Sequence, residues 1–391
     1  MPDAEIIPLG TRGRPGRGSG TRRPSSAARD LARGARRTPG ADAGGPGPDD
    51  GGPAVGPAPT PRGVPKVGAT PAAPALARPG GTVREPREGI PAADWAAAIA
   101  QGAREVLGEQ WEPRLAGMLA TVRRRLTGDY AIDEYGFDAE LTRHLLFAVL
   151  RPLAERWFRI EVRGLENIPT EGGALVVSNH SGTIPVDGLM TMFSVHEHTG
   201  RYLRPLGADL VFRTPVVAGV ARKMGATLAC SEDAERMLRD GELVGVWPEG
   251  FKGIGKPYSE RYKLQRFGRG GFVSAALRTG VPVVPVSVVG AEEIYPLVGN
   301  VPSLARLLGL PYVPITPLFP LLGPLGLVPL PSKWLIEFGE PIRTDTLAGD
   351  AADGADAADD PMLVLTVTDQ VRETIQQTLY ALLMERPSVF G

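Results

Sequence analysis

The sequence predicts an α/β fold, a single domain with a largely parallel or mixed central sheet covered by helices. From Arg159 onward, short apolar runs rich in β-branched residues alternate with stretches of helical periodicity, a pattern typical of parallel strands joined by crossover helices. The chain of 391 residues is long enough for two domains or for one large domain with tails. No apolar run reaches the roughly 18 residues of a membrane-spanning helix, so we expect none.

The predicted strands are apolar runs bounded by turn or helix signals. In chain order they are "FRIEVRG", "ALVVSN", "YLRPLG", "TLAC", "LVGVW", "PVVPVSVVG" and "WLIEFG". Helices fit between several of them. One is "EDAERMLRD", for which Ser231 is the predicted N-cap. The alternation favours a sandwich in which helices lie against the sheet.

The chain divides by composition into five parts. Residues 1–88 are rich in Gly, Pro, Ala and Arg and bury too little apolar surface to fold, so we expect a disordered tail. Residues 89–155 hold an amphipathic helical segment, with helices over "AADWAAAIAQGAREVLGEQW" and "DAELTRHLLFAVLRPLAERWF". The α/β domain spans 156–345. An acidic, Ala-rich linker over 346–361 leads to a closing amphipathic helix over 362–391.

The bulk composition excludes several classes of function. A formal net charge of −1 gives no global basic field, so we expect no nucleic-acid partner. Cys230 is the only cysteine, which rules out a disulfide framework and a Cys-based zinc site and fits a reducing cytoplasm. The first residues lack the apolar run of a secretion signal. We expect no metal and no bound cofactor.

One candidate catalytic pair lies in "ALVVSNHSGTIPVDGLM". His180 follows a buried-type strand, and the carboxyl ends of strands are where open α/β sheets bind ligands. An aspartate that accepts from one ring nitrogen fixes the tautomer and leaves the other nitrogen free to act as a base. Pro185 suits the start of a helix that carries Asp187 in its first turn. The alternative is that His180 only caps loop backbone.

A second candidate stretch, "VWPEGFKGIGKPYSE", is nearly a phosphate-binding P-loop. Pro257 stands where that motif needs Ser or Thr for magnesium, and no helix is predicted to begin at Lys256. The P-loop interpretation therefore fails. Glu249 and Lys252 instead place a carboxylate and a cation at a strand end, where they can bind a polar acceptor.

These stretches together resemble the glycerolipid acyltransferase superfamily, in particular its lysophosphatidic-acid-acyltransferase-like family. Its blocks appear in order as "NHSGTIPVD", "PEGFK" and "VPVVPVSVVG" within residues 155–345. The resemblance implies transfer of a fatty acyl group from an acyl thioester, acyl-CoA or acyl carrier protein, to the hydroxyl of a lipid acceptor. It implies mono- or diacylglycerol or lysophosphatidic acid as acceptor, and a peripheral position at the inner face of the cell membrane.

The resemblance also assigns residues. His180 and Asp187 become the catalytic dyad, with His180 as general base in a single displacement. Backbone N–H groups near Gly250 or in the Ser181–Gly182 turn are candidate donors to the oxyanion. Other residues would shape the acceptor site, line the acyl-donor side or bind phosphate at a helix start. These substrate-binding candidates are Asn179, Glu249, Gly250, Lys252, Arg266, Arg269 and Pro285.

The sequence departs from the family pattern in two ways. The spacer between His180 and Asp187 has two residues more than is usual, so the dyad requires a bulged turn. Lys252 stands in a block where the family has Thr-Arg, and Cys230 stands near the place of another arginine. Lysine is a point charge that cannot hold phosphate bidentately. The pattern therefore favours a neutral acceptor, with a phosphate-bearing acceptor as the alternative.

The apolar stretch "ITPLFPLLGPLGLVPLPSKW", residues 315–334, is interrupted by five prolines, which forbid a spanning helix. It either dips into the membrane interface, with Lys333 and Trp334 at the headgroups, or forms an irregular flap over the core. Two rival functions stay open. One is a catalytically silent lipid-binding protein, suggested by the wide spacer. The other is a serine hydrolase, disfavoured because no Gly-x-Ser-x-Gly motif occurs.

Overall fold

The structure is a computed structural model that describes residues 100–102, 104, 108–214, 216–308, 310–347 and 354–390. The predicted tail over 1–88 and most of the first predicted helix lie outside the described residues. The chain separates into two units, and the elements from α3 onward belong to the unit that contains Gly102–Gly391.

A seven-stranded sheet forms the centre of this unit, with the order β1-β9-β6-β2-β5-β3-β4. β6, β2, β5, β3 and β4 run parallel to one another, whereas β9 is antiparallel to β6 and parallel to β1. The strands are β1 (Glu161–Arg163), β2 (Ala174–Ser178), β3 (Leu203–Gly207), β4 (Thr227–Leu228), β5 (Leu243–Val246), β6 (Val283–Val289) and β9 (Leu335–Phe338). Each predicted apolar run supplies one of them, so the predicted α/β class is confirmed.

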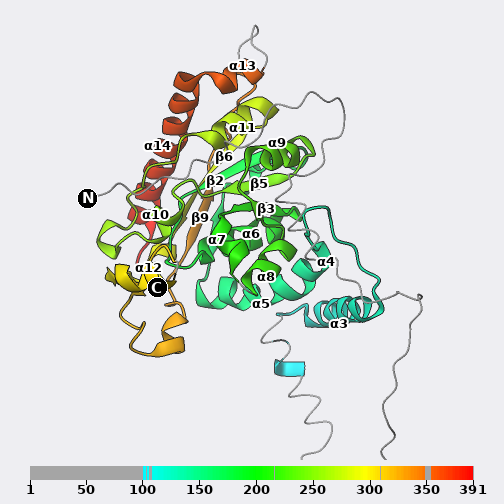
Figure 1. Ribbon diagram of the computed structural model, residues 1–391. Coiled ribbons are helices and arrows are strands. Elements are labelled where there is room, and N and C mark those ends of the chain that lie inside the picture. Colours follow the sequence, from blue (N-terminus) through cyan, green and yellow to red (C-terminus); the bar gives the residue numbers. More distant parts are fainter. Residues whose placement is uncertain are drawn as a thin grey trace, which may run out of the picture. The chain divides into compact units, whose positions relative to one another are not determined.

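The helices connect and cover these strands (Figure 1). They are α3 (Trp111–Thr127), α4 (Ala139–Leu141), α5 (Phe147–Pro152), α6 (Val186–Thr199), α7 (Asp209–Arg213), α8 (Val217–Lys223), α9 (Ser231–Arg239), α10 (Phe251–Ile254), α11 (Gly271–Thr279), α12 (Pro302–Leu308), α13 (Gly354–Asp359) and α14 (Pro361–Glu385). Two π-helical turns, Thr142–Leu146 and Leu153–Trp157, complete the predicted helix over 138–158. A separate two-stranded antiparallel sheet consists of β7 (Gly299–Asn300) and β8 (Pro314–Ile315). It was not predicted, because each strand is only two residues long.

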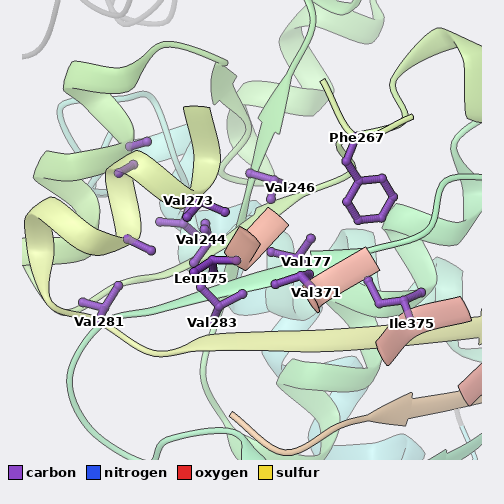
Figure 2. Close-up of a cluster of buried hydrophobic side chains, with 14 of the residues drawn as sticks. Leu175, Val177, Val244, Val246, Phe267, Val273, Val281, Val283, Val371 and Ile375 are labelled. Carbon is purple, nitrogen blue, oxygen red and sulfur yellow. The ribbon is translucent and has the colours of Figure 1, made fainter. Parts of the chain in front are cut away.

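Alternate side chains of the strands pack into two cores on opposite faces of the sheet. Leu175 and Val177 of β2 lie in the core shared with α9, α11, α13 and α14 (Figure 2). Ala174 and Val176 lie in the core shared with α5 and α6. Because successive side chains of a strand point to opposite faces, an uninterrupted apolar run such as "ALVV" requires cover on both sides.

The connections place β2 where the sheet reverses its winding. The chain leaves β2 through α6 toward β3 on one side, and it later leaves β5 through α11 for β6 on the other side. Ligands of open α/β sheets bind at such a switch point, beyond the carboxyl ends of the strands. The segments that follow β6, β2 and β5 are therefore neighbours, although they are far apart in sequence.

Three local predictions are wrong. The predicted acidic linker contains helix α13, whose Ala357 and Ala358 are buried, because small side chains let it pack closely on α11. Trp334 is fully buried and stacks on Phe158 at a ring separation of 4.5 Å, so it does not face headgroups. The N-cap of α9 is Cys230, and Ser231 is the first residue of the helix.

Candidate active site

The dyad predicted from the sequence is assembled at the carboxyl end of β2. Nδ1 of His180 lies 2.7 Å from Oδ2 of Asp187, which is fully buried in the first turn of α6. The same oxygen accepts the backbone N–H of Ser181 at 2.8 Å. Nδ1–H therefore donates to Asp187, and Nε2 has no hydrogen-bond partner among the residues that the structure describes. The His180 side chain is 12% exposed, which is enough for contact with a substrate.

The long spacer is accommodated by a turn with two left-handed residues. Gly182 has φ +93° and Thr183 has φ +63°, a region that β-branched residues rarely adopt. The backbone N–H of Thr183 donates to the carbonyl of Ile254 at 3.2 Å, and the hydroxyl of Tyr312 donates to the Thr183 carbonyl. Burial raises the pKa of Tyr312 to about 12, so this hydroxyl keeps its proton. The bulged turn required for the dyad is present, and Tyr312 braces it.

Glu249 lies beneath the dyad and is almost completely buried. Its Oε1 accepts the backbone N–H of His180 at 2.9 Å, and its Oε2 accepts that of Gln265 at 2.6 Å. Oε2 also lies 3.4 Å from Nζ of Lys256. Both carboxylate oxygens are thus engaged inside the protein, and one of them holds the backbone of His180.

The "PEG" turn brings the short helix α10 directly against His180. Gly250 precedes α10 with φ +56° and ψ −142°, a conformation that favours glycine. A Cβ atom on Gly253 would lie 2.8 Å from the carbonyl oxygen of His180 and 2.7 Å from Cβ of Glu249. Lys252, on the same helix, is exposed. Gly253 was missed by sequence reasoning, because its importance depends on which backbone it contacts.

Two of the predicted binding residues have structural positions instead. The amide of Asn179 is fully buried and bonds the backbone of Val288 with both of its ends, at 3.0 and 2.8 Å. Pro285 is buried in β6, where it pairs with Val177 of β2 and its carbonyl accepts the backbone N–H of Gly339 at 2.8 Å. Both residues are buried, so neither side chain is open to a ligand from the surface as the sequence-based assignment expected.

The predicted arginines lie in the loop before α11. Arg266 and Arg269 are both exposed. Arg269 borders a polar hollow of about 350 Å³ between α9 and α11, and neither His180 nor Asp187 lines this hollow. Neither arginine forms a hydrogen bond or ion pair with His180 or Asp187 among the described residues.

Both predicted groups of oxyanion donors are partly occupied. The N–H of Gly250 donates to the carbonyl of Trp247 at 3.0 Å, and the N–H of Ser181 donates to Asp187. The Trp247 ring lies beside the dyad, with its centroid 5.9 Å from that of the His180 ring. The half-buried aromatic ring thus borders one side of the His180 ring.

The sequence missed a further charged group at the site. Lys256, considered above only as a P-loop lysine, has its Nζ 3.2 Å from Oε1 of Glu292 as well as near Glu249. Burial raises the pKa of Glu292 to about 7. Lys256 and Glu292 are distant in sequence, and no motif joins them.

Comparisons with known proteins relate the chain to acyltransferases. The family model described as Acyltransferase matches residues 159–289. An uncharacterised protein of Mycobacterium tuberculosis is 58% identical over 278 residues, which cover 71% of this chain and 76% of that protein. A human protein named "DGAT1/2-independent enzyme synthesizing storage lipids" is 29% identical over 144 residues, 37% of this chain and 44% of that protein. A chloroplastic 1-acyl-sn-glycerol-3-phosphate acyltransferase of Arabidopsis thaliana is 26% identical over 151 residues, 36% of this chain and 38% of that protein.

The matched domain, with its His-Asp pair at the end of a central strand, places the protein among the acyltransferases. The chain belongs to the glycerolipid acyltransferase superfamily.

Proposed function

We propose that the protein transfers a fatty acyl group from an acyl thioester to the hydroxyl of a lipid acceptor. The observation that carries this proposal is the 2.7 Å contact between Nδ1 of His180 and Asp187, which leaves Nε2 free to accept a proton. The family supplies the reaction class. The acyl thioester, acyl-CoA or acyl carrier protein, is a co-substrate, and no other cofactor or metal is proposed.

The reaction follows from the geometry of the dyad. Nε2 of His180 takes the proton of the acceptor hydroxyl while the oxygen attacks the thioester carbon. Collapse of the tetrahedral intermediate breaks the C–S bond, and the proton on His180 passes to the departing thiolate. Asp187 holds the ring in the required tautomer and stabilises the imidazolium. No covalent acyl-enzyme is needed.

A neutral acceptor such as mono- or diacylglycerol agrees best with the charges at the site. Glu249 and Lys256 compensate each other inside the protein. Lys252 is the cation on α10, and it is exposed. A single point charge makes a weak phosphate site compared with a bidentate arginine. Lysophosphatidic acid is the second candidate, because one of the relatives is named for that acceptor class.

We also propose peripheral binding to the inner face of the cell membrane. No helix in the described ranges has the length and apolarity needed to cross a bilayer. In the Pro-rich segment, Leu321 is 83% exposed and Leu325 is 69% exposed. Leu307 of α12, between β7 and β8, is 81% exposed. Exposed apolar side chains gathered in one segment favour a lipid interface.

The test is thiol release from oleoyl-CoA by wild type and His180→Ala. Monoolein, diolein, lysophosphatidic acid and a long-chain alcohol serve as separate acceptors. Release that needs an acceptor and is lost in the variant supports the proposal and identifies the acceptor. Release without any acceptor indicates a hydrolase. If neither oleoyl-CoA nor an oleoyl carrier protein reacts, the protein is a silent lipid binder on this fold and the proposal is refuted.

A further inference from the structure

Lys256 is a buried lysine that the acyl-transfer steps above do not use. Its Nζ lies 3.2 Å from Oε1 of Glu292 and 3.4 Å from Oε2 of Glu249. The side chains of Lys256, Glu249 and Glu292 are 2%, 0% and 6% exposed. Burying charged groups costs several kcal/mol unless they are well paired. One ammonium group between two carboxylates therefore needs an explanation.

The three charged residues connect the segments that follow three adjacent strands. Glu249 follows β5, and Glu292 lies in the turn Ala291–Glu293 after β6. Between β5 and β6 lies β2, which ends just before His180. Glu249 contacts Lys256 with one oxygen and the backbone N–H of His180 with the other. Lys256 is thus linked to the general base through one carboxylate.

Two neighbouring buried carboxylates repel each other when both are ionised. The pKa of Glu292 is raised to about 7, mainly by burial and also by the Glu249 charge, whereas Lys256 and a backbone hydrogen bond from Tyr262 oppose the rise. The adjacent Glu293 is paired with Arg386 of the chain that follows α14. Lys256 is therefore the cation in direct contact with both Glu249 and Glu292.

We infer that Lys256 is a positioning residue for the proposed acyl transfer. Its ammonium group lies between Glu249 and Glu292, offsets the repulsion between the two carboxylates and so keeps Glu249 bonded to the backbone of His180. The inference rests on the proposed function for one of its two measurements, the rate of acyl transfer. Without Lys256, ionisation of Glu292 repels Glu249 and loosens the general base.

The experiment compares Lys256→Met, Lys256→Met with Glu292→Gln, and the control Lys263→Met. Lys263 is 61% exposed and pairs only loosely with Glu260, at 3.7 Å. Thiol release from oleoyl-CoA in the presence of monoolein is measured from about pH 6 to about pH 9 and divided by the wild-type rate. For Lys256→Met this ratio should fall by up to about tenfold per pH unit above the pKa of Glu292, because the protonated form of Glu292, which does not repel Glu249, decreases by that factor. For the double variant and the control the ratio should stay level.

Stability must be followed in parallel. A carboxyl group whose pKa is raised on folding stabilises the protein below its unfolded pKa and loses that contribution as the pH rises through the folded pKa. For Glu292 this window runs from 4.5 to about 7, and it moves higher once Lys256 is removed. Rates are therefore compared only where thermal unfolding shows each variant to be folded.

The second readout needs no activity. The chain has four histidines, and the Nδ1 proton that His180 donates to Asp187 should give a downfield proton resonance, assigned by its loss in His180→Ala. It should persist to about pH 9 in wild type, weaken with rising pH in Lys256→Met, and return in the double variant. This resonance decides the inference even if wild type transfers no acyl group, an outcome that refutes the proposed function alone.

Three results would overturn the inference. A rate ratio for Lys256→Met that does not change with pH would mean that the lysine only fills space. A resonance that is as persistent in Lys256→Met as in wild type would mean that His180 is held without it. If Lys256→Met does not fold, the double variant decides. A folded double variant that lacks both activity and the resonance would exclude a role of Lys256 through Glu292.

Discussion

Replacing Gly253 by alanine should disable the general base without removing any functional group. The added Cβ would lie 2.7 Å from Cβ of Glu249, 2.8 Å from the carbonyl oxygen of His180 and 3.0 Å from Cβ of His180. These neighbours are backbone atoms or Cβ atoms, so no flexible side-chain end can move aside. The residue also packs between Glu249 and His180, which are hydrogen-bonded to each other.

The size of the effect follows from these contacts. Extending 2.8 Å to the ordinary contact distance of 3.4 Å displaces His180 or α10 by about 0.6 Å. A misplacement of about 1 Å costs about 10²-fold in rate, so we expect a loss of roughly tenfold in kcat with little change in acceptor KM. The higher helix propensity of alanine stabilises the protein by at most about 1 kcal/mol. Overpacking by the added methyl group destabilises it by about 1–3 kcal/mol. The net change in unfolding free energy is then a loss of about 0–2 kcal/mol.

The assay is acceptor-dependent thiol release together with thermal unfolding. Gly219→Ala in α8 is the matched control, because Gly219 is exposed and a Cβ atom there meets nothing within 4 Å. The control should keep wild-type activity and gain up to about 1 kcal/mol of stability. If Gly253→Ala keeps the wild-type kcat while folding normally, α10 does not fix the position of His180, and the reasoning is wrong.

Three further changes test the dyad, its brace and the lipid-facing segment. Asp187→Asn should lower kcat by about 10²- to 10⁴-fold through loss of the correct tautomer. A steady-state effect confined to KM would instead make Asp187 a binding residue. Tyr312→Phe removes the hydroxyl that holds the spacer turn. It should lower the unfolding free energy by about 0.5–1.5 kcal/mol, measured by thermal unfolding, and it should lower kcat. The control Tyr380→Phe, at an exposed position, should change neither quantity. Leu321→Asp combined with Leu325→Asp should weaken co-sedimentation with anionic vesicles at least about tenfold, since a buried leucine contributes about 1.5–3 kcal/mol. Unchanged sedimentation would place the membrane contact elsewhere.

The fold was predictable because its signals are local. Each strand of the main sheet is an apolar run, and the His-Asp pair is separated by a turn and one helix start. The roles of Asn179 and Pro285 were not predictable, because they depend on β6 being the neighbour of β2. Lys256 and Glu292 meet for the same reason. The position of Trp334 was predicted wrongly, because an apolar sequence neighbourhood fits both a membrane interface and a buried core. Only its packing against Phe158 shows that it is buried.

Two carboxylates contact His180, and their different roles explain why only one of them is given a cation. Asp187 contacts the ring and, in the proposed mechanism, stabilises the imidazolium that forms when the acceptor is deprotonated. Glu249 accepts the backbone N–H of His180 with Oε1, and its Oε2 lies 3.4 Å from Nζ of Lys256. The ammonium group of Lys256 offsets the negative charge of Glu249. Asp187 is therefore the carboxylate that acts directly on the His180 ring.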